Sequence, residues 1–193
     1  MKRLLPLPLY ALLISLLFSS CGYNTMVTQQ EAVDGEWAQV NAAYQQRNDL
    51  IGNLVETVKG YANFEQETLI KVTEARASAT QVKVDASQLT EEGIQKYQAA
   101  QGQLTSALSK LLSITENYPN LKADQGFSDL RAELSGQENR ILVARRKFND
   151  AVKEYNTTIQ TFPNNMMSGM FGFKKKGYFE AEAGAEKAVK VKF

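Results

Sequence analysis

Apolar residues recur every three or four positions over most of this 193-residue chain, and this spacing predicts helices rather than strands. From Met26 to Tyr61 the steps alternate between four and three, as in coiled-coil packing. Only Gln30 and Arg47 interrupt the seam. At ~1.5 Å per residue, this pattern predicts a first helix about 50 Å long. The seam consists of Val33, Trp37, Val40, Tyr44, Ile51, Leu54, Val58 and Tyr61.

Two shorter helices are predicted next. Asn63 and Gln66 have the spacing of a capping box, which places the start of a second helix at Asn63 and its end near Lys83. After a polar connection at residues 85–90, the helical spacing resumes and predicts a third helix. This helix should end at Pro119, because the residue before a proline is disfavoured in the helical conformation.

The fourth helix has the most regular pattern, and Pro163 should end it. Short connections between long helices favour antiparallel neighbours. The sequence therefore predicts an all-α fold, an elongated antiparallel four-helix bundle with long first and fourth helices over residues 21–162. The aromatic rows should form its core, and the row of the fourth helix repeats every seven residues through Phe127, Leu134, Ile141, Phe148, Tyr155 and Phe162.

The last segment, residues 163–193, has a different composition. It contains several methionines and aromatic residues, then Lys174, Lys175 and Lys176, and three glycines between residues 169 and 177. Glycine-rich segments of this kind favour loops. We expect an irregular C-terminal tail that its aromatic residues partly order.

The first 20 residues resemble an export signal that ends at Cys21, the only cysteine of the chain. Lys2 and Arg3 precede a short apolar run, and Ser19 and Ser20 come before the cysteine. A lipoprotein signal of this form predicts a lipidated Cys21 as the mature N-terminus. An uncleaved helical anchor and a plain secretory signal are the alternatives, although the run is shorter than the ~20 residues that span a bilayer.

Composition excludes several classes of function. Removal of residues 1–20 takes away two positive charges and changes the net charge from +1 to −1, so no electrostatic surface for nucleic acid is expected. The chain contains no histidine, which excludes the Glu-x-x-His pattern of di-iron bundles and the usual general base. A calcium or magnesium site made of carboxylates alone stays open, but no calcium-loop motif suggests one. We expect no catalysis, no metal and no cofactor.

Arg47 is the unusual residue of the first seam, because a charge at a core position is costly unless it is paired. One hypothesis groups Arg47 with Asp49, Asn53 and Glu56 as a polar cluster that recognises a partner. The alternative is a structural ion pair with the fourth helix. Its candidate acceptors are Glu133, Glu138 and Glu154.

Several blocks of sequence, in order, resemble the LemA family of bacterial envelope proteins. The resemblance lies in residues 46–51, 53–62, 75–76, 116–123, 127–134, 138–141, 144–145, 155–156, 162–163 and 171–173. It implies an all-helical domain held at a membrane, and it brings no accepted enzymatic activity. Two features depart from the family pattern. Gly52 occupies a position where proline is frequent, and Cys21 replaces the usual hydrophobic anchor helix.

These observations together predict a non-catalytic interaction or scaffold module. It would be anchored by lipid in the bacterial envelope, with its domain outside the cytoplasm and other envelope proteins as partners. A self-assembling coiled-coil protein is the main alternative, and a carboxylate-based enzyme is a weaker one. If the helices run up-down-up-down, the tail returns to the lipid end. Phe171, Phe173 and the three lysines 174–176 would then contact the bilayer surface, unless the aromatic residues instead cap the base of the bundle.

Overall fold

A computed structural model describes residues 7–60 and 65–180, with side chains from residue 22 onward. In the described residues, every element of regular secondary structure is a helix. The elements are α1 (Leu7–Lys59), α2 (Gln66–Gln81), the 3-10 turn η1 (Ala86–Gln88), α3 (Glu91–Thr115), α4 (Pro119–Lys122), α5 (Gln125–Gln160) and α6 (Asn164–Ser168).

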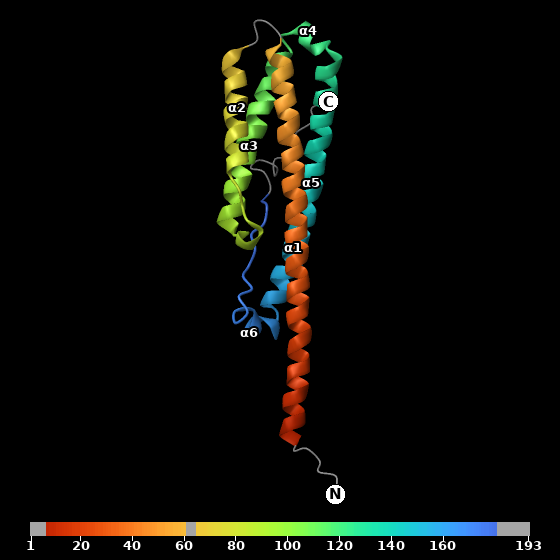
Figure 1. The fold of residues 1–193 in the computed structure, drawn as a ribbon, viewed down its shortest axis with the longest axis vertical. Coiled ribbons are helices and arrows are strands. Elements are labelled where there is room, and N and C mark those ends of the chain that lie inside the picture. Colours follow the sequence, from red (N-terminus) through yellow and green to blue (C-terminus); the bar gives the residue numbers. More distant parts are fainter. Residues whose placement is uncertain (1–6, 61–64, 181–193) are drawn as a thin grey trace, which may run out of the picture.

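The predicted antiparallel four-helix bundle is confirmed. In Figure 1, α1 rises from the N-terminal end, α2 descends, α3 rises and α5 descends again. The two long helices are α1 with 53 residues and α5 with 36, and they pack against each other along the bundle. The shorter helices α2 and α3 cover only the half of this pair that lies farther from the N-terminus (Figure 1).

Side-chain caps fix the start of two helices. Thr90 accepts a hydrogen bond from the backbone N–H of Gly93 at α3, and Asp124 accepts one from Phe127 at α5. The predicted cap at Asn63 lies outside the described residues, and α2 begins at Gln66 after Glu65, which makes no side-chain cap bond. The third helix ends before Pro119, as predicted, and Tyr118 is not helical. The helix ends at Thr115, and Pro119 begins the short α4, where its missing N–H costs no hydrogen bond.

The core consists of two apolar clusters stacked along the bundle. The cluster nearer the N-terminal end contains Trp37 and Phe148, and the other contains Leu54 and Leu104. The predicted seam of α1 is buried from Val33 to Val58, while Tyr61 lies outside the described residues. In α5, the row of seven-residue steps is buried from Phe127 to Tyr155. Phe162 is 74% exposed, so its placement in the core was wrong, because α5 ends at Gln160 and the chain turns away.

The C-terminal tail is more ordered than predicted. Residues 164–168 form α6 at the N-terminal end of the bundle, and the chain then runs back along it as an extended segment (Figure 1). Phe179 of this segment is 4% exposed and joins the cluster around Trp37. The tail therefore covers the α1–α5 pair where α2 and α3 no longer reach.

Candidate interaction surfaces

A buried polar layer around Arg47 separates the two apolar clusters. The side chain of Arg47 is 2% exposed and lies between Tyr44 and Ile51, which belong to different clusters. Its guanidinium forms an ion pair with Glu138 of α5, with 3.2 Å between Nη1 and Oε1. The structural alternative for Arg47 therefore holds, with Glu138 rather than Glu133 or Glu154 as the acceptor.

Helix α3 supplies the remaining partners of Arg47. The Nη1 atom donates to the Thr105 hydroxyl at 3.0 Å, and Nη2 donates to the side-chain oxygen of Gln101. The Tyr44 ring lies 5.0 Å from the guanidinium carbon. A charge enclosed in this way holds three helices in one register, because a shift of any of them would leave it unpaired.

Tyr97 lies beside this layer and is buried as well. Its hydroxyl donates to the side-chain oxygen of Asn41 at 3.1 Å. Burial raises the pKa of Tyr97, Tyr44 adds to the shift, and Arg47 partly opposes it. Tyr97 is therefore neutral over the whole physiological range and acts as a hydrogen-bond donor.

The four residues of the predicted polar cluster do not form one site. Arg47 points into the bundle, whereas Asp49 and Asn53 line a hollow between α1 and α5 on the surface. Glu56 is exposed and pairs with Lys59 one turn away. The helical period explains why Arg47 lies apart, because positions two residues apart point to nearly opposite sides of a helix, whereas Asp49, Asn53 and Glu56 have the i, i+4, i+7 spacing of a single face.

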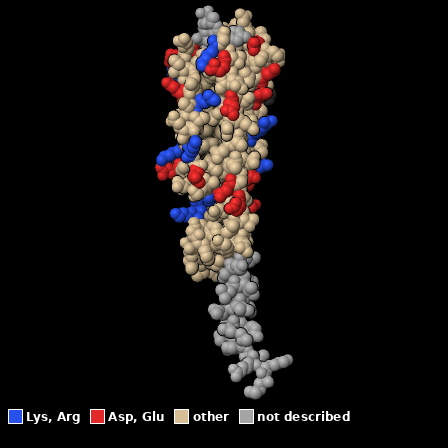
Figure 2. All heavy atoms as spheres, viewed as in Figure 1, with Lys and Arg blue, Asp and Glu red and all other residues tan. Residues whose placement is uncertain are grey.

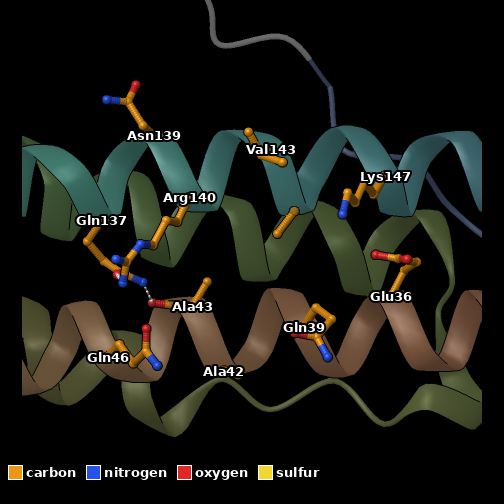
Figure 3. Close-up of a pocket in the computed structure, with 11 residues that line it drawn as sticks. Glu36, Gln39, Ala42, Ala43, Gln46, Gln137, Asn139, Arg140, Val143 and Lys147 are labelled. Carbon is orange, nitrogen blue, oxygen red and sulfur yellow. Dashed lines mark hydrogen bonds between the residues drawn. The ribbon is translucent and has the colours of Figure 1, made fainter.

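A groove follows the contact of α1 with α5 on the surface, and we call it the α1–α5 groove. Figure 3 shows its central part, with Gln39 and Gln46 on α1 facing Arg140 and Lys147 on α5. This part has a volume of about 650 Å³, and the adjoining hollow with Asp49 adds about 460 Å³. Gln137 crosses the floor and donates to the backbone oxygen of Ala43 at 2.7 Å (Figure 3). The groove combines a floor of small residues with a rim of mixed charge, which suits a protein surface rather than a small apolar ligand.

An uncharged zone with several exposed apolar side chains lies at the end of the bundle near the N-terminal part of α1. Figure 2 shows this zone as a tan band without charged side chains, next to the undescribed part of the molecule. Its contacts bring α6 and the tail to the residues that follow Cys21: Gly22 lies against Asn164, and the Tyr23 ring meets that of Phe171 edge-on at 5.0 Å. We call this zone the apolar collar. Its large exposed side chains are Tyr23, Phe162, Met166, Met170 and Phe171.

The predicted membrane-contacting tail residues fall into three groups. Phe171 is exposed in the collar, and Phe173 is half-buried against the Tyr23 ring at 5.7 Å. Lys174 and Lys175 are exposed. Lys176 is buried, and its ammonium group donates to the backbone oxygen of Ala86 at 2.8 Å, so its expected contact with lipid headgroups was wrong.

Two kinds of feature are absent from the residues that the structure describes. In these parts of the chain, no three acidic or cysteine side chains lie close enough together to hold a metal ion. Within residues 7–60 and 65–180, no helix has a stretch long and apolar enough to cross a membrane. The backbone of α1 is helical through Cys21, whose side chain lies outside the described part.

Comparison with known sequences shows the family of this chain. The sequence profile of the LemA family matches residues 36–193, which is most of the chain. The chain belongs to the LemA family. Its relatives include Protein LemA of Metamycoplasma hominis, with 27% identity over 158 residues, which are 82% of this chain and 68% of that protein.

Magnetosome proteins are also among the relatives of this LemA family chain. Magnetosome protein MamQ 2 of Paramagnetospirillum magneticum is 26% identical over 175 residues, which cover 82% of this chain and 64% of that protein. Magnetosome protein MamQ of Magnetospirillum gryphiswaldense is 26% identical over 174 residues, which cover 81% of this chain and 64% of that protein. The chain thus spans slightly less than two thirds of the magnetosome proteins. Membership of the family supports an envelope-associated protein.

Sequence reasoning missed two features of these surfaces. The collar includes Phe162, which the seven-residue period had assigned to the core. The burial of the tail segment after Lys175 had no signal in the local sequence.

Proposed function

We propose that this LemA family protein is a non-catalytic scaffold of the bacterial envelope that is anchored to the membrane by a lipidated Cys21. The apolar collar carries the proposal, because it lies against α1 directly after this cysteine. Exposed methionine and aromatic side chains favour the interface of a bilayer, where they would reinforce a lipid anchor. The collar and the nearby Lys174 and Lys175 would supply the second contact.

The anchored domain would stand away from the membrane. From Tyr23 to Lys59, α1 has 37 residues in helix, which at ~1.5 Å each correspond to about 55 Å. The α1–α5 groove lies along this length, in reach of other envelope proteins. The charged rim of the groove, with Glu36 and Asp49 opposite Arg140 and Lys147, gives a partner both signs of charge to match.

The collar is tested by measuring its depth in a membrane. The full chain with Met170→Trp is reconstituted in anionic vesicles that contain brominated lipids, and tryptophan fluorescence is recorded. The Ile70→Trp variant is a matched control, because Ile70 is also exposed but lies on α2. The buried Trp37 gives the same background in both variants.

We expect bromine to quench the Met170→Trp signal strongly and the Ile70→Trp signal weakly. Equal quenching in the two variants would contradict the membrane contact of the collar. The groove is tested separately by a photo-reactive amino acid at Val143 or, as a control, at Ile70, in intact cells. Envelope-protein adducts specific to Val143 are expected, and identical adducts from both sites would refute a role for the groove.

Self-assembly through the helical seam finds less support. A coiled coil between protomers needs exposed seam positions, and those of α1 from Val33 to Val58 are buried within a single chain.

A further inference from the structure

Side-chain amides form hydrogen bonds with the backbone at the end of the described tail. Asn156 accepts a hydrogen bond from the N–H of Lys176 at 3.0 Å and donates to its carbonyl oxygen at 2.9 Å. Asn149 forms the same pair of bonds with Phe179, both at 2.9 Å. Gln98 of α3 does so with Glu180, both at 3.1 Å. Three side-chain amides thus satisfy both backbone groups of three tail residues.

The spacing of these amides matches an extended peptide. Asn149 and Asn156 are seven residues apart on α5, which corresponds to about 10.5 Å. Lys176 and Phe179 are three residues apart in an extended chain, which corresponds to about 10 Å. The two helix positions therefore bind the strand in register, and the binding of its backbone requires no particular side chains.

Further contacts make the site selective for the residues at positions 176 and 177. The ammonium group of Lys176 is buried and contacts the Ala86 carbonyl and, at 3.4 Å, the Asp34 carboxylate. Gly177 leaves no room for a larger residue, because a Cβ atom there would lie 2.6 Å from the Cα of Glu91. Its own N–H donates to the Leu89 carbonyl at 2.8 Å.

Phe179 occupies an aromatic pocket. Its ring stacks on Trp37 at 6.0 Å and meets Phe148 edge-on at 5.5 Å, and the guanidinium of Arg145 lies 4.9 Å from its centre. Tyr178, between the two selected residues, is exposed. The site therefore recognises the sequence lysine, glycine, any residue, phenylalanine. We call it the tail site.

We propose that the tail site is a peptide-recognition site that also accepts Lys176–Glu180 of a second copy of this chain. The residues that bind the segment lie on α1, α3, α5 and around η1, at least 20 positions away in sequence. None of their contacts depends on the connection to α5. The seven residues between α6 and Lys176 include Gly172 at φ +77°, and extended they reach about 23 Å. The segment can thus leave one tail site for another while α6 stays in place.

Concentration decides which copy supplies the segment. A short flexible link gives its own segment an effective concentration in the millimolar range. The tail is docked in cis, so its dissociation constant for the site must lie below about 1 mM. In dilute solution the chain is then a monomer, and exchange appears when the cis segment is impaired or the copies are crowded.

The test combines two full-length variants in detergent. Gly177→Val with Phe179→Ala leaves the tail site empty, and Asn149→Ala with Asn156→Ala leaves the tail free but intact. Native mass spectrometry should find each variant alone as a monomer and the mixture as a dimer with one copy of each. A mixture that stays monomeric at concentrations about tenfold above the dissociation constant measured for the tail peptide would argue against exchange.

A labelled peptide of residues 172–180 provides a second measurement. It should bind the variant with the empty site with a dissociation constant below ~1 mM. The peptide with Gly177→Val should bind about tenfold or more weakly, whereas the peptide with Tyr178→Ala should bind within about threefold of the natural one. Absence of saturable binding, or equal binding of all three peptides, would overturn the proposal. So would failure of either protein variant to fold, because the segment would then be an obligatory part of the core.

Discussion

The ion pair of Arg47 with Glu138 is open to a direct energetic test. Glu138→Gln keeps the size of the side chain and a hydrogen-bond acceptor but removes the negative charge. Arg47 cannot lose its own charge in compensation, because the guanidinium stays protonated in proteins. The substitution would therefore leave a buried positive charge with neutral partners only.

The structure sets the size of the expected effect. At 3.2 Å and an effective dielectric constant of ~20, the attraction is about 5 kcal/mol before screening by solvent. The side chain of Glu138 is 41% exposed, so water screens much of this attraction. Exposed pairs contribute about 0–1 kcal/mol, and breaking a buried pair costs about 3–5 kcal/mol. We expect Glu138→Gln to cost about 2 kcal/mol, or about 4–8 °C in melting temperature.

Urea unfolding followed by circular dichroism measures this loss, and a double-mutant cycle assigns it. In the Arg47→Met background, Glu138→Gln should cost less than about 0.5 kcal/mol, because its partner is already gone. Glu133→Gln is the matched control on the same helix and should also stay within about 0.5 kcal/mol. If Glu138→Gln costs the same with and without Arg47, the pair does not stabilise the bundle.

Three other outcomes follow from the described contacts. Phe148→Ala should destabilise the protein by about 3–5 kcal/mol, whereas Phe162→Ala should change its stability by less than about 0.5 kcal/mol in the same unfolding assay; equal losses would contradict their different burial. The raised pKa of Tyr97 implies that its contribution to stability is complete below about pH 10 and is lost as the pH rises toward the folded-state pKa. Thermal melts between about pH 8 and 11 should therefore fall more steeply for the natural chain than for Tyr97→Phe, and parallel curves would exclude this residue as the cause. Mass spectrometry of the membrane-extracted protein should find an acylated N-terminus at Cys21 that Cys21→Ser abolishes, and an unmodified cysteine would rule out the lipid anchor.

The helical period predicted the bundle because it depends on local spacing. Each seam position from Val33 to Val58 is buried because a helix returns to the same face every three or four residues. The same reasoning failed at Phe162, where the period continues but the helix does not. The sequence predicted an ion pair of Arg47 with the fourth helix and offered Glu133, Glu138 and Glu154 as candidates. The choice of Glu138 depends on the vertical offset between two helices, which no local pattern encodes.

The tail was harder to predict because its order depends on distant residues. Three consecutive lysines have the pattern of a solvated charged segment, yet Lys176 is buried beside Asp34, 142 positions earlier. Nothing near Phe179 in the sequence indicates the pocket made by Trp37 and Phe148. Similarly, the collar forms only when distant parts of the chain come together, since Tyr23 and Phe171 meet only after the chain has reversed direction three times.

The position of Phe179 also orders the events of synthesis. Trp37 leaves the ribosome early, but the ring that stacks on it is added only after every helix of the described bundle has been made. A nascent chain that stops after α5 has all four helices of the bundle and an open aromatic pocket. The core is therefore complete only in chains whose translation has passed residue 179. Prematurely terminated chains expose an apolar site to chaperones and proteases.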